Sequence, residues 1–186
     1  MAELLAKHSK LKICEVEDNM KVEKNQVYII PNNMYMTIRK GKLRLVKKQA
    51  KDTPHMTINT FFHSLAEDGG DKAIGIILSG TGNDGSLGIA AIHQAGGMVL
   101  AQDPATAKFD GMPSAAIATG FVDAILPTES MPAVIENYVR KLPWKPDIDT
   151  LTEEEEEITI TATISEAIFD DVTMNLNFAG TAEGAG

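Results

Sequence analysis

Short apolar runs in the first third of the chain alternate with polar residues in the manner of β-strands. The pattern predicts strands over residues 13–16 and 26–31, and a proline at position 31 ends the second of them. Residues 34–38 and 43–46 flank a short basic segment in which Gly41 accepts a positive φ. These two segments therefore predict a β-hairpin with a basic surface.

Helical spacing replaces this alternation near residue 58. Apolar residues between Ile58 and Ala66 recur three and four positions apart, which predicts a helix with one buried face. Two consecutive glycines at 69–70 end this helix. A shorter amphipathic helix is expected over residues 1–10.

From residue 73 onward, strands and helices alternate. The continuous apolar run 73–78 predicts a parallel strand covered on both faces, and it ends at the glycine-rich turn 80–85. The elements expected after the turn are a helix carrying Leu87, Ile89, Ile92 and Ala95, a strand over 98–101, a helix opened by Pro113 and running to Thr119, a strand over 121–126 and a helix over 131–141. This order predicts an α/β fold, a mainly parallel sheet flanked by helices (Rossmann-like or doubly wound), with the β-hairpin added.

The length and composition narrow the class of protein. A chain of 186 residues suffices for one ordinary domain and an appendage. No apolar run approaches the roughly 18 residues of a membrane span, so membrane insertion is not expected. The single cysteine, Cys14, excludes an internal disulfide and a cysteine-based metal cage. With no signal peptide at the start of the sequence, a cytoplasmic protein is expected.

Charge divides the chain into two parts. Residues 1–146 hold all 17 basic residues and 15 of the 26 acidic ones, a net charge of +2, whereas residues 147–186 hold the other 11 acidic residues, a net charge of −11. The break follows the segment Pro143-Trp144-Lys145-Pro146. We therefore expect a domain over residues 1–143 and an acidic linker or tail over 144–186.

The glycine-rich turn has two competing interpretations from its residues alone. Gly80, Gly82 and Gly85 match G-x-G-x-x-G between a strand and a helix, and Asp103 follows about 20 residues later, as in a dinucleotide site. Against this, Asp84 lies where a pyrophosphate would bind, and its charge repels that ligand. The alternative is that the turn presents Asp84 itself at the end of a strand, either as a cap of the following helix or as a functional carboxylate.

Several neighbouring segments together are more specific than the turn alone. They are Leu78-Ser79-Gly80-Thr81-Gly82-Asn83-Asp84-Gly85, Gln94-Ala95-Gly96-Gly97, Ala101-Gln102-Asp103 and Phe109-Asp110-Gly111-Met112-Pro113-Ser114-Ala115-Ala116-Ile117. In this combination they strongly resemble the catalytic domain of the chemotaxis protein-glutamate methylesterases, the CheB family. The likeness extends upstream through the strand at 26–31 and the helix at 61–66, and covers about residues 3–142.

The resemblance implies a hydrolase in bacterial chemotaxis signalling. Members of the family hydrolyse γ-glutamyl methyl esters on methylated chemoreceptors, and often deamidate receptor glutamines, with a Ser, a His and an Asp in that chain order. Asp84 matches the aspartate of this triad. Thr81, where the family commonly has Met, lies at a position whose backbone N–H the family associates with the oxyanion site. The resemblance implies no cofactor and no metal.

The resemblance also implies that the serine and the histidine precede Met1, so that the chain is a domain truncated at its N-terminus. No serine of the chain stands in the family's nucleophile turn, and no histidine matches the family's catalytic position. The serines are Ser9, Ser64, Ser79, Ser86, Ser114, Ser130 and Ser165, and the histidines are His8, His55, His63 and His93. We therefore expect little esterase activity from the chain as given. Tyr35 and Asn59 replace a His and an Asp usual in the family, and these changes are expected at the substrate rim.

Partners follow from charge and from the resemblance. The basic residues Arg39, Lys40, Lys42, Arg44, Lys47, Lys48 and Lys51 form a surface suited to an acidic receptor segment or, in some members, a receiver domain. The sequence Phe109-Asp110-Gly111 resembles that of family members fused to a chemotaxis methyltransferase. This resemblance implies that the acidic tail is an interdomain linker. A body charge of only +2 gives no support to nucleic-acid binding. A non-catalytic α/β module that binds receptors or other partners is the alternative to the enzyme.

Overall fold

The computed structural model of the chain describes residues 5–49 and 56–140. Part of the helix predicted over 1–10 and the whole acidic tail lie outside these residues. The strands are β1 (Lys12–Glu15), β2 (Gln26–Ile29), β3 (Met34–Arg39), β4 (Lys42–Lys47), β5 (Ile74–Ile77), β6 (Met98–Gln102) and β7 (Ala124–Leu126). The helices are α2 (Thr57–Gly69), α3 (Gly88–Gln94), α4 (Gly111–Ile117) and α5 (Met131–Val139), with short 3₁₀ turns η1 (Gly70–Lys72), η2 (Pro104–Thr106) and η3 (Thr128–Ser130).

The strands form three small sheets. β5, β6 and β7 pair in parallel in the order β5-β6-β7, and β1 and β2 form a separate parallel pair. β3 and β4 form the antiparallel hairpin that the sequence predicts, and its turn residues Lys40 and Gly41 both have positive φ (51° and 65°). The α/β class and the parallel sheet flanked by helices are confirmed.

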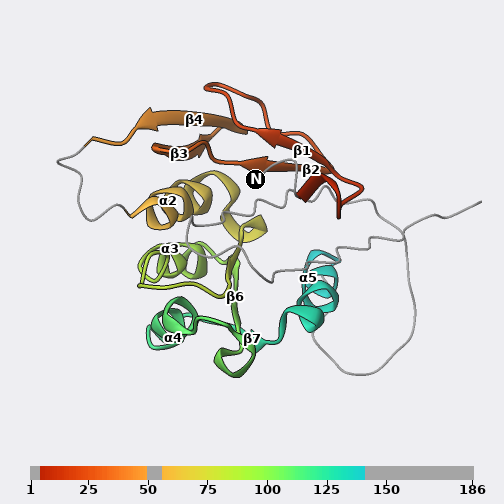
Figure 1. The fold of residues 1–186 in the computed structure, drawn as a ribbon, viewed down its shortest axis with the longest axis vertical. Coiled ribbons are helices and arrows are strands. Elements are labelled where there is room, and N and C mark those ends of the chain that lie inside the picture. Colours follow the sequence, from red (N-terminus) through yellow and green to blue (C-terminus); the bar gives the residue numbers. More distant parts are fainter. Residues whose placement is uncertain (1–4, 50–55, 141–186) are drawn as a thin grey trace, which may run out of the picture.

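The helices cover the two faces of the three-stranded sheet unequally. Figure 1 shows α2, α3 and α4 in a row on one side of β5–β7, with α5 on the other side. The hairpin lies beyond α2, so that α2 packs between β3 and α3. The buried strand predicted over 73–78 is confirmed as β5, with Ile77 buried toward the larger core and Ile74 and Ile76 partly buried toward α5.

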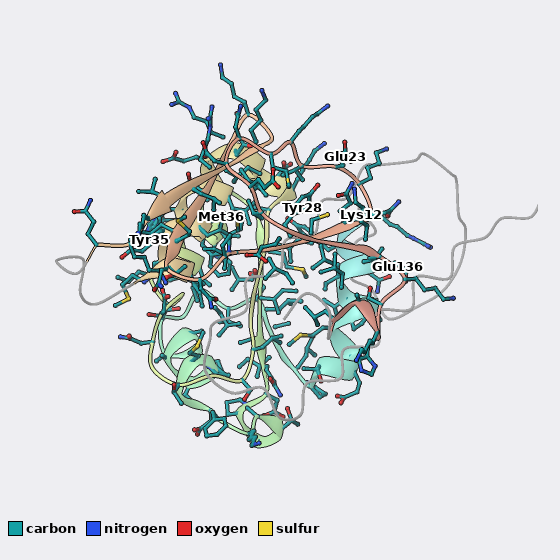
Figure 2. All side chains as sticks on the ribbon, turned by 45° about the horizontal axis from the view of Figure 1, so that its top comes forward. Lys12, Glu23, Tyr28, Tyr35, Met36 and Glu136 are labelled. Atoms are coloured by element: carbon teal, nitrogen blue, oxygen red, sulfur yellow. The ribbon has the colours of Figure 1, made fainter. Side chains whose placement is uncertain are left out.

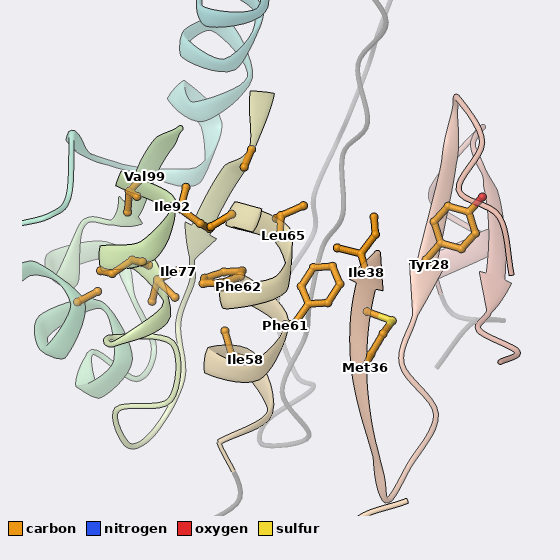
Figure 3. Packing of buried hydrophobic residues seen from close by; sticks show 14 of the residues in the cluster. Tyr28, Met36, Ile38, Ile58, Phe61, Phe62, Leu65, Ile77, Ile92 and Val99 are labelled. Atoms are coloured by element: carbon orange, nitrogen blue, oxygen red, sulfur yellow. The ribbon is translucent and has the colours of Figure 1, made fainter. Parts of the chain in front are cut away.

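Adjacent phenylalanines let α2 join two layers. Phe61 and Phe62 are 0% and 3% exposed, and they project from different faces of the helix. Figure 3 shows Phe61 directed toward Met36 of β3 and Phe62 directed toward Ile77 of β5. The buried residues on both sides belong to one continuous hydrophobic cluster. This cluster connects the hairpin to the parallel sheet through α2.

The N-terminus of α2 is capped by a side chain from a distant turn. The N–H of Ile58 donates to Oδ2 of Asp84 (2.9 Å), and the N–H of Asn59 donates to Oδ1 of the same carboxylate (3.0 Å). The residue that precedes the helix, Met56, makes no side-chain capping bond. Asp84 therefore supplies the acceptor that the first turn of α2 needs, at the end where the helix dipole favours negative charge.

Asn59 makes the reciprocal contact with α3. Its Oδ1 accepts the N–H groups of Gly85 (3.0 Å), Leu87 (3.1 Å) and Gly88 (2.7 Å) at the start of that helix. The two helices approach closely here, since a Cβ added to Gly88 would lie 2.7 Å from Cβ of Phe62. The start of α2 thus takes its acceptor from Asp84 of the turn, and the start of α3 takes its acceptor from Asn59 of α2. This pair of caps fixes the position of the turn at 80–85.

The structure corrects the expectations for three side chains. Asp84 does not cap the helix that follows it, because that helix takes its cap from Asn59 while Asp84 caps α2. Asn59 does not lie on a surface rim, since it is 6% exposed between two helices. Leu87 precedes α3 rather than lying on its buried face, and it is 65% exposed.

The reciprocal cap predicts a large stability effect for Asn59. The Asn59→Ala variant leaves three backbone N–H groups without an acceptor, two of them on buried glycines, so we expect the free energy of unfolding to fall by about 2–3 kcal/mol. Urea unfolding followed by circular dichroism measures the change. Asn59→Asp keeps an acceptor and should recover most of the loss, whereas Asn83→Ala, at an exposed side chain in the same turn, should change stability by less than about 0.5 kcal/mol. Equal losses for Asn59→Ala and Asn83→Ala would contradict the cap.

Candidate functional site

The turn at residues 80–85 lies at the carboxyl end of β5, where open parallel sheets keep their sites. The segment that leads into α4 packs against it. The N–H of Gly80 donates to the carbonyl oxygen of Phe109, the N–H of Met112 donates to that of Gly80 (both 2.9 Å), and the N–H of Phe109 donates to Oγ of Ser79 (3.0 Å). Two loops that are about 30 residues apart in sequence are thereby joined into one rigid rim.

Gln102, at the end of β6, hydrogen-bonds to the segment that precedes the turn. The residue is 7% exposed, its Oε1 accepts the N–H of Ser79 (2.8 Å), and its Nε2 donates to the carbonyl oxygen of Thr106 (3.2 Å). The role of Gln102 was not predicted from the sequence. An amide side chain at the end of an otherwise apolar strand is the signal that points to such a bond, because buried polar groups need partners.

The glycines of the G-x-G-x-x-G pattern each have a packing or conformational role. A Cβ on Gly80 would lie 2.4 Å from Sδ of Met112, and one on Gly85 would lie 2.6 Å from Cδ1 of Ile77. Gly82 and Gly85 have φ values of +87° and +99°. A residue with a side chain would be strained at these backbone angles. The spacing of the glycines therefore follows from the shape of the turn.

The same geometry argues against the dinucleotide interpretation. A pyrophosphate would need the N–H groups at the start of α3, but Asn59 already accepts those of Gly85, Leu87 and Gly88. The carboxylate of Asp103, expected on a ribose in that interpretation, instead accepts the N–H of Ala105 (2.9 Å) and caps η2. The N–H groups and the carboxylate that a dinucleotide would need are thus bonded within the protein itself.

Asp84 combines fixed orientation with spare acceptor capacity. Its side chain is half-buried, and each carboxylate oxygen accepts one N–H group from α2. A carboxylate oxygen has two lone pairs, so each oxygen keeps one for a further donor. The carboxylate therefore has the acceptor capacity for a further donor, such as an imidazole N–H, in addition to its contact with α2.

Thr81 supplies an open donor in the same turn. The residue is exposed, and within residues 5–49 and 56–140 its backbone N–H donates to no acceptor. A backbone donor at a strand end, free of internal partners, has the property that an oxyanion site requires. Thr81 and Asp84, the two site residues predicted from the sequence, thus share one turn that glycines and the two caps hold in shape.

His93, one of the described histidines, makes its contacts away from this turn. His93 Nδ1 is 3.3 Å from Oδ1 of Asp123, near the start of β6 and so at the opposite end of the sheet. This pair borders a cavity of about 350 Å³ that also contacts Tyr138. Burial and, to a lesser extent, the carboxylates of Asp71 and Asp123 raise the pKa of Tyr138, and its hydroxyl donates to the carbonyl oxygen of Asp71. His55 lies outside the described residues.

The serines near the turn make structural bonds. Ser79 Oγ accepts the N–H of Phe109, and the hydroxyl of Ser86 donates to the carbonyl oxygen of Asn83 (2.8 Å). Among the described residues, no group of three or more His, Cys, Asp and Glu side chains is arranged to hold a metal ion. In that part of the chain, none of the helices has both the length and the apolar character that a membrane crossing requires.

Comparison with known proteins agrees with the resemblance seen in the sequence. The family model described as CheB methylesterase matches residues 1–135. A protein-glutamate methylesterase/protein-glutamine glutaminase of Geobacter sulfurreducens is 41% identical over 134 residues, which is 70% of this chain and 36% of that protein. An uncharacterized 104.1 kDa protein of Rhodobacter capsulatus is 43% identical over 143 residues, or 77% of this chain and 15% of its own length.

A solved structure shares the fold. The CheB methylesterase catalytic domain of Thermotoga maritima has a TM-score of 0.65 and 29% identity, and the match covers 72% of this chain and 73% of that one. The chain spans well under half the length of the curated relatives named above. With the family model matching 135 of its 186 residues, the chain belongs to the CheB methylesterase family.

Proposed function

We propose that this chain forms the part of a protein-glutamate methylesterase catalytic domain that supplies the triad aspartate, Asp84, and an oxyanion donor, the N–H of Thr81. The observation that carries the proposal is the turn itself. It presents a carboxylate with a spare lone pair on each oxygen together with an N–H that has no acceptor among the described residues, three residues apart, at the carboxyl end of a parallel strand. Relatives named protein-glutamate methylesterase/protein-glutamine glutaminase support the same activity.

The proposed reaction uses a serine and a histidine from the segment that the family places before the first strand present here. The histidine takes the serine proton as the hydroxyl attacks the ester carbonyl, and Asp84 accepts the imidazole N–H, selects its tautomer and stabilises the imidazolium. The N–H of Thr81 donates to the oxyanion of the tetrahedral intermediate. Methanol leaves, and water then hydrolyses the acyl-enzyme to free glutamate; a glutamine side chain would release ammonia by the same steps.

The caps explain why the turn suits this role. The two N–H groups of α2 direct the carboxylate of Asp84, and Asn59 holds the chain on the other side of it at Gly85. A catalytic group needs its geometry fixed before the substrate arrives, because reorganisation adds to the barrier. The reciprocal cap provides this without a bond to the serine or the histidine.

The remaining parts of the proposal concern the whole protein. Residues 1–143 form the partial catalytic domain, and residues 144–186 form the acidic linker or tail. The substrates are γ-glutamyl methyl esters of methylated chemoreceptors in the cytoplasm, with glutamine deamidation as a second activity. Receiver and methyltransferase domains, in the same chain or in another, are further partners.

A chimera tests the role of Asp84. The segment that bears the family's serine and histidine, taken from the Thermotoga maritima domain, is joined to residue 1, and methanol release from methylated receptor fragments is measured. We expect activity, and we expect Asp84→Asn to lower kcat by about three orders of magnitude because the wrong imidazole tautomer is favoured. KM should change little. Thermal unfolding separates this loss from any weakening of the α2 cap.

Asn83→Ala is the matched control, since its side chain is exposed in the same turn and should leave kcat within about twofold. A folded Asp84→Asn chimera with kcat within about tenfold of the parent would remove Asp84 from the triad. A folded parent chimera without any activity would favour the non-catalytic binding module instead.

Two substitutions at Thr81 test whether its backbone N–H serves as an oxyanion donor. Thr81→Met keeps the N–H and restores the common family residue, so we expect kcat within about twofold of the parent chimera. Thr81→Pro removes the N–H and should lower kcat by about 10²-fold or more, with the melting temperature as the check that the turn survives. Equal activity of the two folded variants would show that this N–H does not serve the oxyanion.

A further inference from the structure

Basic residues gather in and around the β3–β4 hairpin, and no acidic residue interrupts them in the sequence. From Lys24 to Lys51 the sequence contains eight basic residues and no acidic one. Lys51 lies outside the described residues, and the rest of the group belongs to the hairpin and its approach. Most of these side chains are exposed, and Figure 2 shows nitrogen-tipped side chains extending from this part of the molecule into the open.

The strand register places cations directly beside one another. Arg39 of β3 is opposite Lys42 of β4, and Lys42 also pairs with Lys21 through an isolated antiparallel bridge. These three exposed residues form a row across adjacent segments, which we call the cation row. Like charges at directly opposite positions destabilise a sheet. Within the described part of the chain, none of the three forms an ion pair that would offset the repulsion.

The cations continue along the outward side of the hairpin. Arg44 is exposed and lies opposite Thr37, two positions from Lys42 on β4. At the far end, Nζ of Lys48 lies 5.7 Å from the centre of the Tyr35 ring. We define the basic face as Lys21, Arg39, Lys42, Arg44 and Lys48. The opposite side of the hairpin is the buried side that packs on α2, so no described element covers the basic face.

The nearby carboxylates of Asp68 and Asp18 bind the backbone of the hairpin and, among the described residues, form no ion pair with the side chains of the basic face. Asp68 of α2 accepts the backbone N–H groups of Lys40 and Gly41, the latter at 2.9 Å, and Asp18 accepts the N–H of Leu45 (2.9 Å). Both carboxylates therefore bind the backbone of the hairpin rather than its charged side chains. The basic face keeps a charge that an external anionic group can meet.

The sequence of this chain contains a segment of opposite charge. Residues 147–157 include seven acidic residues and no basic one, and they follow α5 by a short connection. The 12 residues between Arg140 and Glu153 span up to about 40 Å when extended. A domain of this size has a radius of gyration of about 14 Å, so the extended connection is about as long as the diameter of the domain. The tether also gives the segment a local concentration of the order of millimolar.

We propose that the acidic segment, residues 147–157, binds the basic face of the same chain. Charge complementarity carries the choice of this occupant, because the tail holds a net charge of −11 and the rest of the chain +2. Binding removes the repulsion within the cation row. An acidic partner that uses the hairpin must then displace the segment, so the tail acts as a competitor for that surface. This proposal does not depend on the esterase activity.

Cross-linking with a carbodiimide, which joins a lysine amine to a carboxylate in contact with it, tests the proposal on the full chain. Peptide mapping of the monomer should find links from Lys21 and Lys42 to Glu153–Glu157. The matched controls are Lys72 and Lys108, which are exposed lysines outside the basic face. At low salt we expect links to the basic face to exceed those to the controls by about fivefold, and about 0.5 M salt should abolish the excess.

Variants give the second arm of the experiment. Changing Glu153–Glu157 to glutamine should shift the backbone amide resonances of β3 and β4 at low salt and leave those of α5 unchanged. The double variant Arg39→Gln and Arg44→Gln should lower the cross-links of Lys42 while retaining both lysines. Links spread equally over the basic face and the control lysines would overturn the proposal, as would links found only in dimers, which would indicate a second copy as the occupant.

Discussion

The reciprocal capping of α2 and α3 is the constraint on which the rest of the structure depends. Asp84 accepts N–H groups from α2, and Asn59 of α2 accepts N–H groups from the start of α3. These two residues thus provide acceptors for N–H groups at the start of both helices, which lack partners within their own helix. They also join the turn at 80–85 to α2, on which the hairpin packs. Because the bonds are mutual, the position of the carboxylate is set by the packing of two helices rather than by the turn alone.

This arrangement connects the layers of the fold to the proposed chemistry. Phe61 and Phe62 of α2 join the hairpin and the parallel sheet into one core, and the first turn of the same helix holds Asp84. Gln102 ties the end of β6 to Ser79 beside the turn. A change in the core that moves α2 along its axis would therefore move the carboxylate as well, which links the stability of the domain to the geometry of its site.

The local elements were predictable from the sequence, whereas the partners of the polar side chains were not. The hairpin, the strand at 74–77 and the helix at 57–69 follow from periodicity and from glycines that short-range rules interpret well. The strand predicted over 121–126 is shorter, Ala124–Leu126, because pairing with β6 begins late. Asp84 and Asn59 bond to groups 25–29 positions away, and capping rules consider only the neighbours of a residue in sequence. The family resemblance predicts a catalytic role for Asp84, but it gives no indication that Asp84 holds α2.

The central claim is that Asp84 can bind an imidazole while it caps α2. A crystal structure of the chimera that supplies the serine and the histidine measures this directly. We predict that an imidazole nitrogen lies about 2.6–3.2 Å from a carboxylate oxygen of Asp84 while the N–H groups of Ile58 and Asn59 still donate to that carboxylate. A separation above about 4 Å, or an Asp84 that leaves α2 in order to reach the histidine, would contradict the account.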